Sequence, residues 1–417
     1  MSLTKPDVLV IGAGPAGSLV AAQLARAGHE VLVLEKQNFP RFSIGESLLA
    51  NSLQFIEAAG MLEAVQKRSF QYKNGAAFAR GALRSEYNFA DKTSPGPAFT
   101  YQVPRADFDH TLILDAERQG ARVRYEVEIT AVDFGGERPL VRSRSAAGEE
   151  GEHRPRFVLD ASGFGRTLPR LLSLDRSSDF PVRAALFTHI EDRIVSGAFD
   201  RQKILVSIHP REHDVWYWLI PFSNGRSSLG VVASREFHQR HAGTTQERLW
   251  QIVREEPGLA RLLAEAKGVA QVGEIVGYAA RVSQLHGPGF ALLGNAAEFL
   301  DPVFSSGVTI AMQSAQLAAQ ALVRQLRGEP VDWEASFAEP LMYGVETFRA
   351  FVTAWYDGSL QDIIFFEQPD PLTRRRICSV LAGYAWDRDN PYTGPLAGQR
   401  LRTLAALCRR ETSERAP

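Results

Sequence analysis

Cysteine is scarce in this chain: its 417 residues include only Cys378 and Cys408. Two isolated cysteines provide neither a disulfide framework nor the spacing of a metal site. The sequence also lacks the ~18–20 consecutive apolar residues of a membrane span. Its first apolar run begins near residue 7, which leaves no room for a signal peptide. We therefore expect a cytoplasmic protein with no stable membrane insertion.

An excess of charge is equally absent. The formal net charge is -1, so no global electrostatic attraction to nucleic acid is expected. Hydrophobic residues make up 45% and charged residues 23% of the chain, which is ordinary for a globular protein. At about 100–200 residues per domain, the length predicts two or three domains.

The most informative stretch is residues 7–36, DVLVIGAGPAGSLVAAQLARAGHEVLVLEK. It reads as strand, glycine turn, helix, strand and acidic residue, the order of a dinucleotide-binding unit. Gly12 permits the tight turn, Gly14 lets the backbone approach a pyrophosphate, and Gly17 lets the helix pack closely on the strand. The helix N-terminus then faces the phosphates, and Glu35 is placed to accept a hydrogen bond from a ribose hydroxyl.

Periodicity along the rest of the chain predicts alternating helical and sheet regions. Helices are expected at 47–59, 104–117, 246–266 and 306–328, and strands at 123–132, 156–160 and 290–293. Residues 70–102 and 183–235 alternate like strands of an antiparallel sheet. Beyond residue 330 the pattern is mostly helical.

These elements predict an α/β protein with a Rossmann-type dinucleotide-binding domain assembled from separated segments. We assign residues 1–68, 103–180 and 273–330 to this domain. Residues 69–102 and 181–272 form an inserted, mainly antiparallel β-sheet domain on the substrate side. Residues 331–417 form a C-terminal helical region.

The fingerprint alone fits either NAD or FAD, and two later stretches favour FAD. LDASG (residues 159–163) and ALLGNAA (residues 291–297) resemble the second and third flavin motifs of the group folded like para-hydroxybenzoate hydroxylase. Asn295 stands where that group normally has an aspartate. Arg105 matches a residue that contacts FAD in the same group, although an exposed arginine at a helix start would look the same.

Further stretches resemble the flavin-dependent halogenases. WYWLIP (216–221) fits their W-x-W-x-I-P signature, FQYKNGAAF (70–78) resembles the segment of their essential lysine, and DPVFSSGV (301–308) resembles their flavin- and halide-side loop. RFSIGESLL (41–49) is also similar. Phe304 replaces a glutamate of the tryptophan halogenases, which indicates the phenol- and pyrrole-type branch. Residues 377–393 resemble halogenase-like flavoproteins of aryl polyene synthesis.

The resemblance implies that FAD, delivered in reduced form by a separate flavin reductase, and O2 convert chloride or bromide to hypohalous acid. Lys73 would then relay the halogen to an electron-rich aromatic, either a small molecule or a substrate bound to an acyl carrier. Trp216 and Trp218 would wall the substrate off from the flavin. Ser306 and Gly307 would bind the halide. The residues implied at the cofactor are Gly12, Gly14, Ala16, Gly17, Glu35, Lys36, Arg41, Ser47, Arg105, Asp160, Gly294, Asn295, Pro302, Gly307 and Val308.

Several of these assignments have a plainer alternative. The tryptophans of 216–221 share one face of a strand with Ile220, as residues of any packed sheet do. Lys73 could be a solvated surface lysine, and the serines before residue 307 a simple helix cap. From residue 374 to the end, nine arginines stand against four acidic residues, which fits either a solvated helical face or a docking surface for an acidic carrier protein.

Two rival functions remain open on this scaffold. One is a hydroxylase or a double-bond reductase, which would form its product without halide. The other is a non-catalytic flavoprotein that presents a carrier-bound intermediate to its partners.

Overall fold

The first apolar runs form the centre of a six-stranded sheet in the order β21-β22-β12-β2-β3-β8, in a computed structural model that describes residues 2–415. Every residue of β2, β3 and β12 is buried. Parallel strands covered on both faces read as continuous apolar runs, which is why this part was predictable. The strands are β2 (Val8–Ile11), β3 (Val31–Leu34), β8 (Arg122–Arg124), β12 (Phe157–Asp160), β21 (His286–Gly287) and β22 (Phe290–Leu292).

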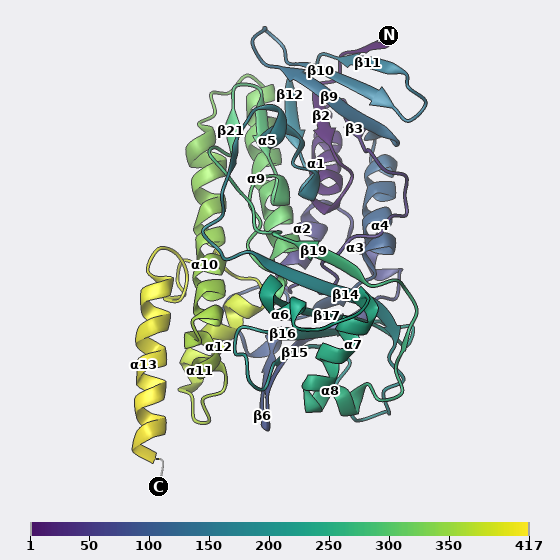
Figure 1. Cartoon of the computed structure of the whole chain (residues 1–417). Helices are drawn as coiled ribbons and strands as arrows, with labels where there is room; N and C mark the ends of the chain where they lie inside the picture. Colours follow the sequence, from purple (N-terminus) through teal and green to yellow (C-terminus); the bar gives the residue numbers. More distant parts are fainter. Residues whose placement is uncertain (1, 416–417) are drawn as a thin grey trace.

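Helices pack on this sheet, and the long ones run side by side in Figure 1. Helix α1 contacts both α9 and α4. A four-stranded sheet in the order β1-β11-β10-β9 lies at the end of the molecule near the N-terminus. The helices are α1 (Pro15–Arg26), α2 (Ser52–Ala58), α3 (Leu62–Gln66), α4 (Arg105–Arg118), α5 (Thr167–Leu171) and α9 (Ser306–Leu326). The strands of the small sheet are β1 (Ser2–Thr4), β9 (Val127–Asp133), β10 (Leu140–Ser145) and β11 (Glu150–His153).

The second large sheet has eight strands in the order β18-β14-β17-β16-β15-β5-β6, with β19 also paired to β14. Its pairs are antiparallel apart from β5 with β15. One face of β16 packs Trp216 and Trp218 into the main core, and the other packs Tyr217 and Leu219 against α7 and α8. The elements are β5 (Gly75–Arg80), β6 (Leu83–Asn88), β14 (Arg183–Glu191), β15 (Lys203–Ile208), β16 (Trp216–Pro221), β17 (Arg226–Ser234), β18 (Lys267–Gly268), β19 (Gly273–Val276), α6 (Arg235–Gln239), α7 (Thr245–Glu255) and α8 (Pro257–Leu262).

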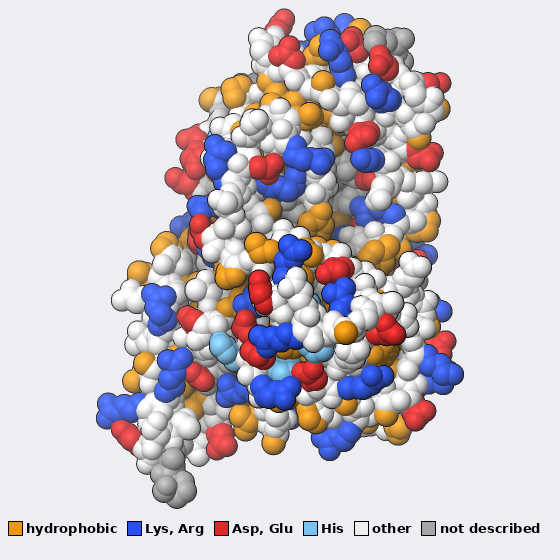
Figure 2. Space-filling model, viewed as in Figure 1, with side chains coloured by type: hydrophobic (Ala, Val, Ile, Leu, Met, Phe, Trp, Pro, Cys, Tyr) orange, Lys and Arg blue, Asp and Glu red, His pale blue; other side chains and the backbone are white. Residues whose placement is uncertain are grey.

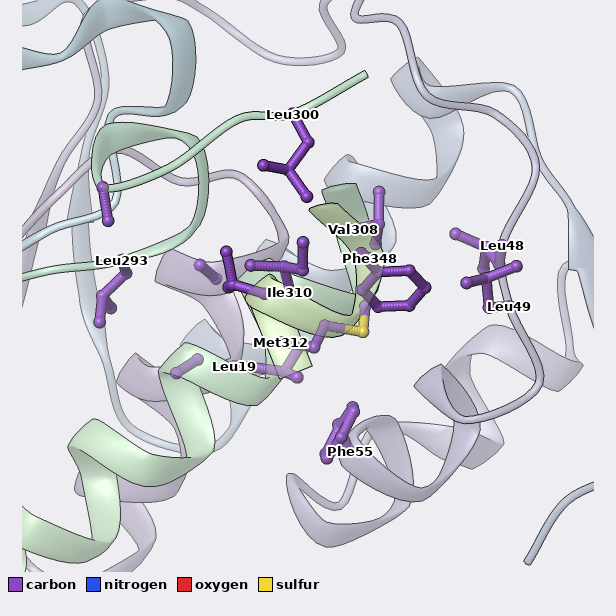
Figure 3. Close-up of a cluster of buried hydrophobic side chains, with 14 of the residues drawn as sticks. Leu19, Leu48, Leu49, Phe55, Leu293, Leu300, Val308, Ile310, Met312 and Phe348 are labelled. Atoms are coloured by element: carbon purple, nitrogen blue, oxygen red, sulfur yellow. The ribbon is translucent and has the colours of Figure 1, made fainter. Parts of the chain in front are cut away.

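The C-terminal region is helical, as expected. Helix α10 packs on α9, and α13 packs on α10 and α11. In Figure 3, Phe348 of α10 lies beside Met312 of α9 and faces Leu48 and Leu49, so the core ties the helices to the segment around residue 48. The helices are α10 (Glu339–Tyr356), α11 (Ser359–Ile364), α12 (Pro371–Leu381) and α13 (Ala397–Arg415). Two short ribbons complete the fold, β4 (Gln71–Lys73) with β7 (Thr100–Gln102) and β13 (Asp175–Arg176) with β20 (Arg281–Val282).

The α/β class, the Rossmann-type sheet, the mainly antiparallel second sheet and the helical C-terminal region are therefore confirmed. The six-stranded sheet draws on residues 8–34, 122–160 and 286–292, and the eight-stranded sheet on 75–88 and 183–276. The exact domain boundaries stay a prediction. Every helix within residues 2–415 is too short or too polar to cross a membrane.

Three predicted elements were wrong in detail. The helix expected at 47–59 begins only at Ser52, because residues 46–48 pair with the strand containing Gln102. The strand expected at 123–132 is split by Glu126, whose φ is 59°. The helix expected at 246–266 is interrupted before Pro257, which lacks the N–H that a continuous helix requires.

Candidate active site

The glycine turn after β2 has the geometry that close backbone approach requires. Gly12 has a φ of 95°, and a Cβ there would lie 2.7 Å from the carbonyl oxygen of Ala161. A Cβ on Gly17 would lie 2.0 Å from the carbonyl oxygen of Gly12. These two glycines therefore hold turn, helix and neighbouring strand together. Helix α1 begins at Pro15 with no acidic residue in its first turn, so its N-terminal N–H groups favour an anion.

Glu35 closes the same turn from the end of β3. Its Oε2 accepts a hydrogen bond from the Ala13 N–H at 2.8 Å, and its Oε1 accepts one from the Gln37 N–H at 2.8 Å. A carboxylate oxygen can accept more than one hydrogen bond. Glu35 can thus fix the turn and still receive a ribose hydroxyl.

A cavity of about 700 Å³ extends from this turn toward the second sheet, a volume typical of cofactor sites. The face drawn in Figure 2 is hollowed between the two sheets, with basic side chains near the rim. The predicted site residues that line the cavity are Gly12, Gly14, Ala16, Glu35, Lys36, Arg41, Ser47, Arg105, Trp216, Trp218, Gly294, Asn295, Pro302, Gly307 and Val308. Most of the predicted residues are therefore brought together around one space.

Four predicted residues lie behind this wall instead. Gly17 packs inside the turn, and Lys73 sits behind Ser47. The oxygens of Asp160 accept hydrogen bonds from the backbone N–H groups of Ser162 at 2.9 Å and Leu168 at 2.6 Å. Asp160 thus organises the loop after β12 rather than lining the cavity. Ser306 is buried at the start of α9, next to the cavity-lining Gly307.

Two arginines and one aspartate hold the loop after β3 against α4. Arg105 forms a bidentate pair with the buried Asp109, with distances of 2.7 and 2.9 Å. Its Nη1 also donates to the Ile44 carbonyl at 2.6 Å, and Arg41 reaches Asp109 at 3.3 Å. Arg105 is buried, so the alternative of an exposed helix-start arginine is wrong.

Glu46 is a cavity residue that the sequence interpretation missed. It is buried, and its Oε1 lies 2.7 Å from Nε2 of His189 on β14. The ring of Phe42 stacks on Phe187 of the same strand at 6.0 Å. The loop of residues 42–46 therefore bridges the two sheets. The available signal was a lone acidic residue within the stretch SIGESLL (residues 43–49), which has no other charged side chain.

Trp216 and Trp218 pack in the sheet, and both also line the cavity. Packing in a sheet and forming a cavity wall are therefore compatible at these two positions. The Nε1–H of Trp218 donates to Ser228 Oγ at 3.0 Å. Its indole lies over Gly230, where a Cβ would come within 2.2 Å of the ring. Ile220 lines the same wall, as the period of a strand requires.

A buried polar network anchors Trp216 to the loop before α9. Its Nε1–H donates to the Tyr356 hydroxyl at 3.1 Å, and that hydroxyl donates to Asp301 Oδ2 at 2.7 Å. The hydroxyl of Tyr278 donates to the same oxygen at 3.0 Å. Burial raises the pKa of Asp301, an effect that the tyrosine hydrogen bonds oppose. Two consecutive hydrogen bonds therefore connect the tryptophan wall to the predicted halide loop.

Tyr356→Phe is therefore expected to lower the free energy of unfolding by about 1–3 kcal/mol, because it leaves the indole N–H of Trp216 buried without its acceptor. Denaturant unfolding measures this change. Tyr392→Phe serves as the control, because no hydrogen bond to its hydroxyl occurs among residues 2–415, and it should change stability by less than about 0.5 kcal/mol. Equal effects of the two variants would contradict the network.

Lys73 is fully buried, so the alternative of a solvated surface lysine is wrong. Its Nζ donates to Ser47 Oγ and to the Leu48 carbonyl, both at 2.7 Å, and lies 5.3 Å from the ring centre of Phe89. Burial lowers the pKa of Lys73 from 10.5 to about 7. The amine can therefore exchange a proton near neutral pH.

This lowered pKa predicts a pH-dependent stability. Between pH 7 and 10.5 the unfolded chain binds more protons at Lys73 than the folded protein, so the free energy of unfolding rises with pH in this window. From pH 7 to pH 9 the wild type should gain about 2 kcal/mol relative to Lys73→Met. Urea unfolding of both proteins at the two pH values measures the gain. Parallel stability curves would contradict a depressed pKa.

The arrangement fits FAD. The α1 N-terminus can hold a pyrophosphate, Glu35 a ribose, and the α9 N-terminus at Gly307 and Val308 the polar edge of a ring system. The cavity joins these places. Within residues 2–415, no group of three or more metal-ligating side chains could hold a metal ion.

Comparison with known proteins agrees with this geometry. Residues 5–334 match the family model described as "FAD binding domain". The chain is 30% identical to the 1H-pyrrole-2-carbonyl-[peptidyl-carrier protein] brominase of Pseudoalteromonas luteoviolacea, over 79% of this chain and 80% of that protein. It is 28% identical to the corresponding chlorinase of Pseudomonas fluorescens, over 90% and 89% of the two chains.

Solved structures give the same picture. A flavoprotein/dehydrogenase from Cytophaga hutchinsonii superimposes with a TM-score of 0.94 at 44% identity, covering 98% of this chain and all of that one. The flavin-dependent brominase Bmp2 superimposes with a TM-score of 0.80 at 26% identity, covering 98% and 100%.

The fold, the glycine turn and the family match define an FAD-binding oxidoreductase-type enzyme. Within that class, the chain belongs to the flavin-dependent halogenase family. These relatives do not favour the hydroxylase, the reductase or the non-catalytic alternatives. The roles of the individual site residues stay predictions.

Proposed function

We propose that this protein halogenates an electron-rich aromatic of the phenol or pyrrole type, with Lys73 delivering the halogen. When bound, reduced FAD supplies with O2 the oxidising power that turns halide into hypohalous acid. One observation carries the proposal: Lys73 Nζ donates to Ser47, and Ser47 lines the same cavity as the glycine turn and the two tryptophans. A small oxidant formed in that cavity needs to pass only one side chain to reach the amine.

The halide is proposed to bind at the start of α9. Ser305, whose φ is 56°, and Gly307 line the cavity there. The first turn of α9 holds no acidic residue, and a helix N-terminus favours an anion. The Ser305 side chain makes no capping hydrogen bond, which disfavours the simple cap. The Ser306 backbone, rather than its buried hydroxyl, would contribute.

The substrate branch is supported by Phe304. Its ring is buried and packs edge-on against Phe351 at 6.2 Å and Trp355 at 5.8 Å. An acid that would orient a weakly activated ring is thus replaced by core packing, which suits a ring that is already activated.

The partners follow from the same proposal. A separate flavin reductase supplies reduced FAD in the cytoplasm, because the sequence carries only one evident dinucleotide fingerprint. The names of the pyrrolyl relatives indicate that an acyl carrier bears the substrate.

Near the C-terminus, Arg409 pairs with Asp362 at 2.6 Å and Arg410 with Glu414 at 2.7 Å. That part of the basic region is better explained as a solvated face.

The test supplies purified protein with FAD, a flavin reductase, NADH and bromide or chloride, and offers a simple phenol or a pyrrole-2-carbonyl carrier protein. We expect a halogenated product that requires both halide and reductase, detected by mass spectrometry. Oxidised product formed equally well without halide would instead identify an oxidoreductase of the kind that the Cytophaga protein's name indicates.

A further inference from the structure

Arg166 follows the loop after β12 and has a backbone conformation that an L-residue rarely adopts. Its φ is 45° and its ψ is 52°, which places it in the left-handed region. Residues 163–165, immediately before it, line the FAD cavity. Strained residues of this kind persist only where surrounding contacts hold them, and they gather at functional sites. The contacts of Arg166 show what holds it.

The guanidinium of Arg166 ties three separate segments together. Its Nη1 donates to the carbonyl of Asn295 at 3.1 Å and to that of Ala296 at 3.3 Å. Its Nη2 donates to the Arg281 carbonyl at 3.0 Å, and its Nε donates to Asp175 Oδ1 at 2.9 Å. A guanidinium presents its donors in a fixed fork. Each of its three nitrogens therefore has an acceptor here.

Asn295 is held by its main chain, while its side chain lines the FAD cavity. It belongs to the short 3-10 turn Gly294–Ala296 that follows β22. The turn is also packed tightly against α9, because a Cβ on Gly294 would lie 2.8 Å from the Cβ of Ala311. Arg166 thus acts on the backbone of a residue that is predicted to contact FAD.

We propose that Arg166 is a positioning residue for FAD, because it fixes the turn that carries Asn295 relative to the loop after β12. The two segments leave neighbouring parallel strands, whose pairing ends with Asp160 opposite Leu292. Beyond that point the strand ladder no longer sets their spacing, and Arg166 supplies the link. The inference rests on the predicted contact of Asn295 with FAD. It does not depend on the reaction that the bound FAD performs.

A purely structural ion pair with Asp175 explains Arg166 less well. The side chain of Asp175 is 45% exposed, whereas that of Arg166 is only 13% exposed. Ion pairs that reach the solvent contribute little to stability. Hydrogen bonds from a charged donor are the stronger kind, and those of Arg166 to Asn295 and Ala296 join the two segments that border the cavity. The clamp on the turn is therefore the main role that its contacts support.

Arg166→Gln and Asn295→Ala test this role together. Each variant should weaken FAD binding about tenfold, because each loses the same positioned contact. Titration of flavin fluorescence with the FAD-free full chain measures the affinity. The double variant should also be only about tenfold weaker, since Arg166 then has no side chain left to position. A loss of about a hundredfold in the double variant would show independent effects and would overturn the proposal.

Arg281→Gln is the matched control. Its side chain is 44% exposed and pairs with Asp179 at 2.8 Å. The substitution keeps the Arg281 backbone carbonyl to which Arg166 donates. FAD affinity should stay within about twofold of the wild type. Equal losses in Arg281→Gln and Arg166→Gln would point to a general disturbance of this region and would contradict a specific clamp.

Two milder variants keep the test decisive if Arg166→Gln does not fold. Arg166→Lys retains the charge but not the fork, so FAD binding should again weaken about tenfold. Asp175→Asn leaves the guanidinium on its carbonyls, so affinity should stay within about twofold. Wild-type affinity in Arg166→Lys would refute the clamp. So would affinities that simply follow the melting temperatures of the FAD-free variants. Since no halide is present, a failure to halogenate leaves these results readable.

Discussion

Lys73→Leu is expected to abolish halogen transfer while leaving halide oxidation intact. Leucine keeps part of the apolar stem of lysine but can neither donate a hydrogen bond nor accept a halogen. Positioned groups of this kind contribute about 10²–10⁴-fold to rate, so halogenated product should fall at least about a hundredfold. Hypohalous acid trapped by monochlorodimedone should stay near the wild-type level, because Lys73 does not line the FAD cavity.

The control for this variant is Lys267→Leu, since Lys267 is exposed on β18. It should leave both measurements unchanged. Lys73→Arg separates the two versions of the relay, because a guanidinium can hydrogen-bond hypohalous acid but stays protonated. Retained product in Lys73→Arg would favour hydrogen bonding, and loss would favour the haloamine. Full product formation in Lys73→Leu would contradict the relay itself.

Gly17→Ala is expected to have the largest effect on FAD. The new methyl carbon would lie 2.0 Å from the Gly12 carbonyl oxygen, so the turn or the helix must move. Overpacking of this kind costs about 1–3 kcal/mol. A displacement of that cost at the phosphate turn should weaken FAD binding by about 10- to 100-fold, as measured by titration of flavin fluorescence.

Gly398→Ala provides the matched control. Gly398 lies in α13, and a Cβ there would meet only ordinary contacts at 3.6 and 3.7 Å. Alanine in a helix should slightly raise stability, with FAD binding unchanged. Equal FAD affinity in the two variants would show that close packing at Gly17 is not required.

The local sequence pattern was enough to predict many of the helices and strands of this protein. The strand, glycine turn and helix of residues 7–36 follow from short-range rules, because turn sterics and apolar periodicity act between near neighbours. The helix from Arg105 and the WYWLIP strand were predictable for the same reason. FAD and the halogenase family followed from motifs that occur in the same order, and both are confirmed.

Other features depended on contacts between distant residues. The strand pairing of Ser47 with Gln102 prevents a helix that periodicity alone favoured. Asp160, placed at the cofactor by its motif, uses both oxygens on nearby backbone N–H groups. Glu46 can pair with His189 only in the folded chain, where β14 places His189 beside the loop of residues 42–46. None of these pairings leaves a periodic signal in the sequence.

By itself, the sequence determined that this chain binds a dinucleotide, that the dinucleotide is FAD, and that Lys73 stands where the halogenases carry their essential lysine. Only the tertiary structure decided that Lys73 is buried, that Ser47 separates it from the cavity, and that Arg166 holds the turn that carries Asn295. The reason is physical. Turns and periodic elements are encoded by neighbouring residues, whereas burial, and the lowered pKa that it causes at Lys73, depends on segments that meet only in the folded chain.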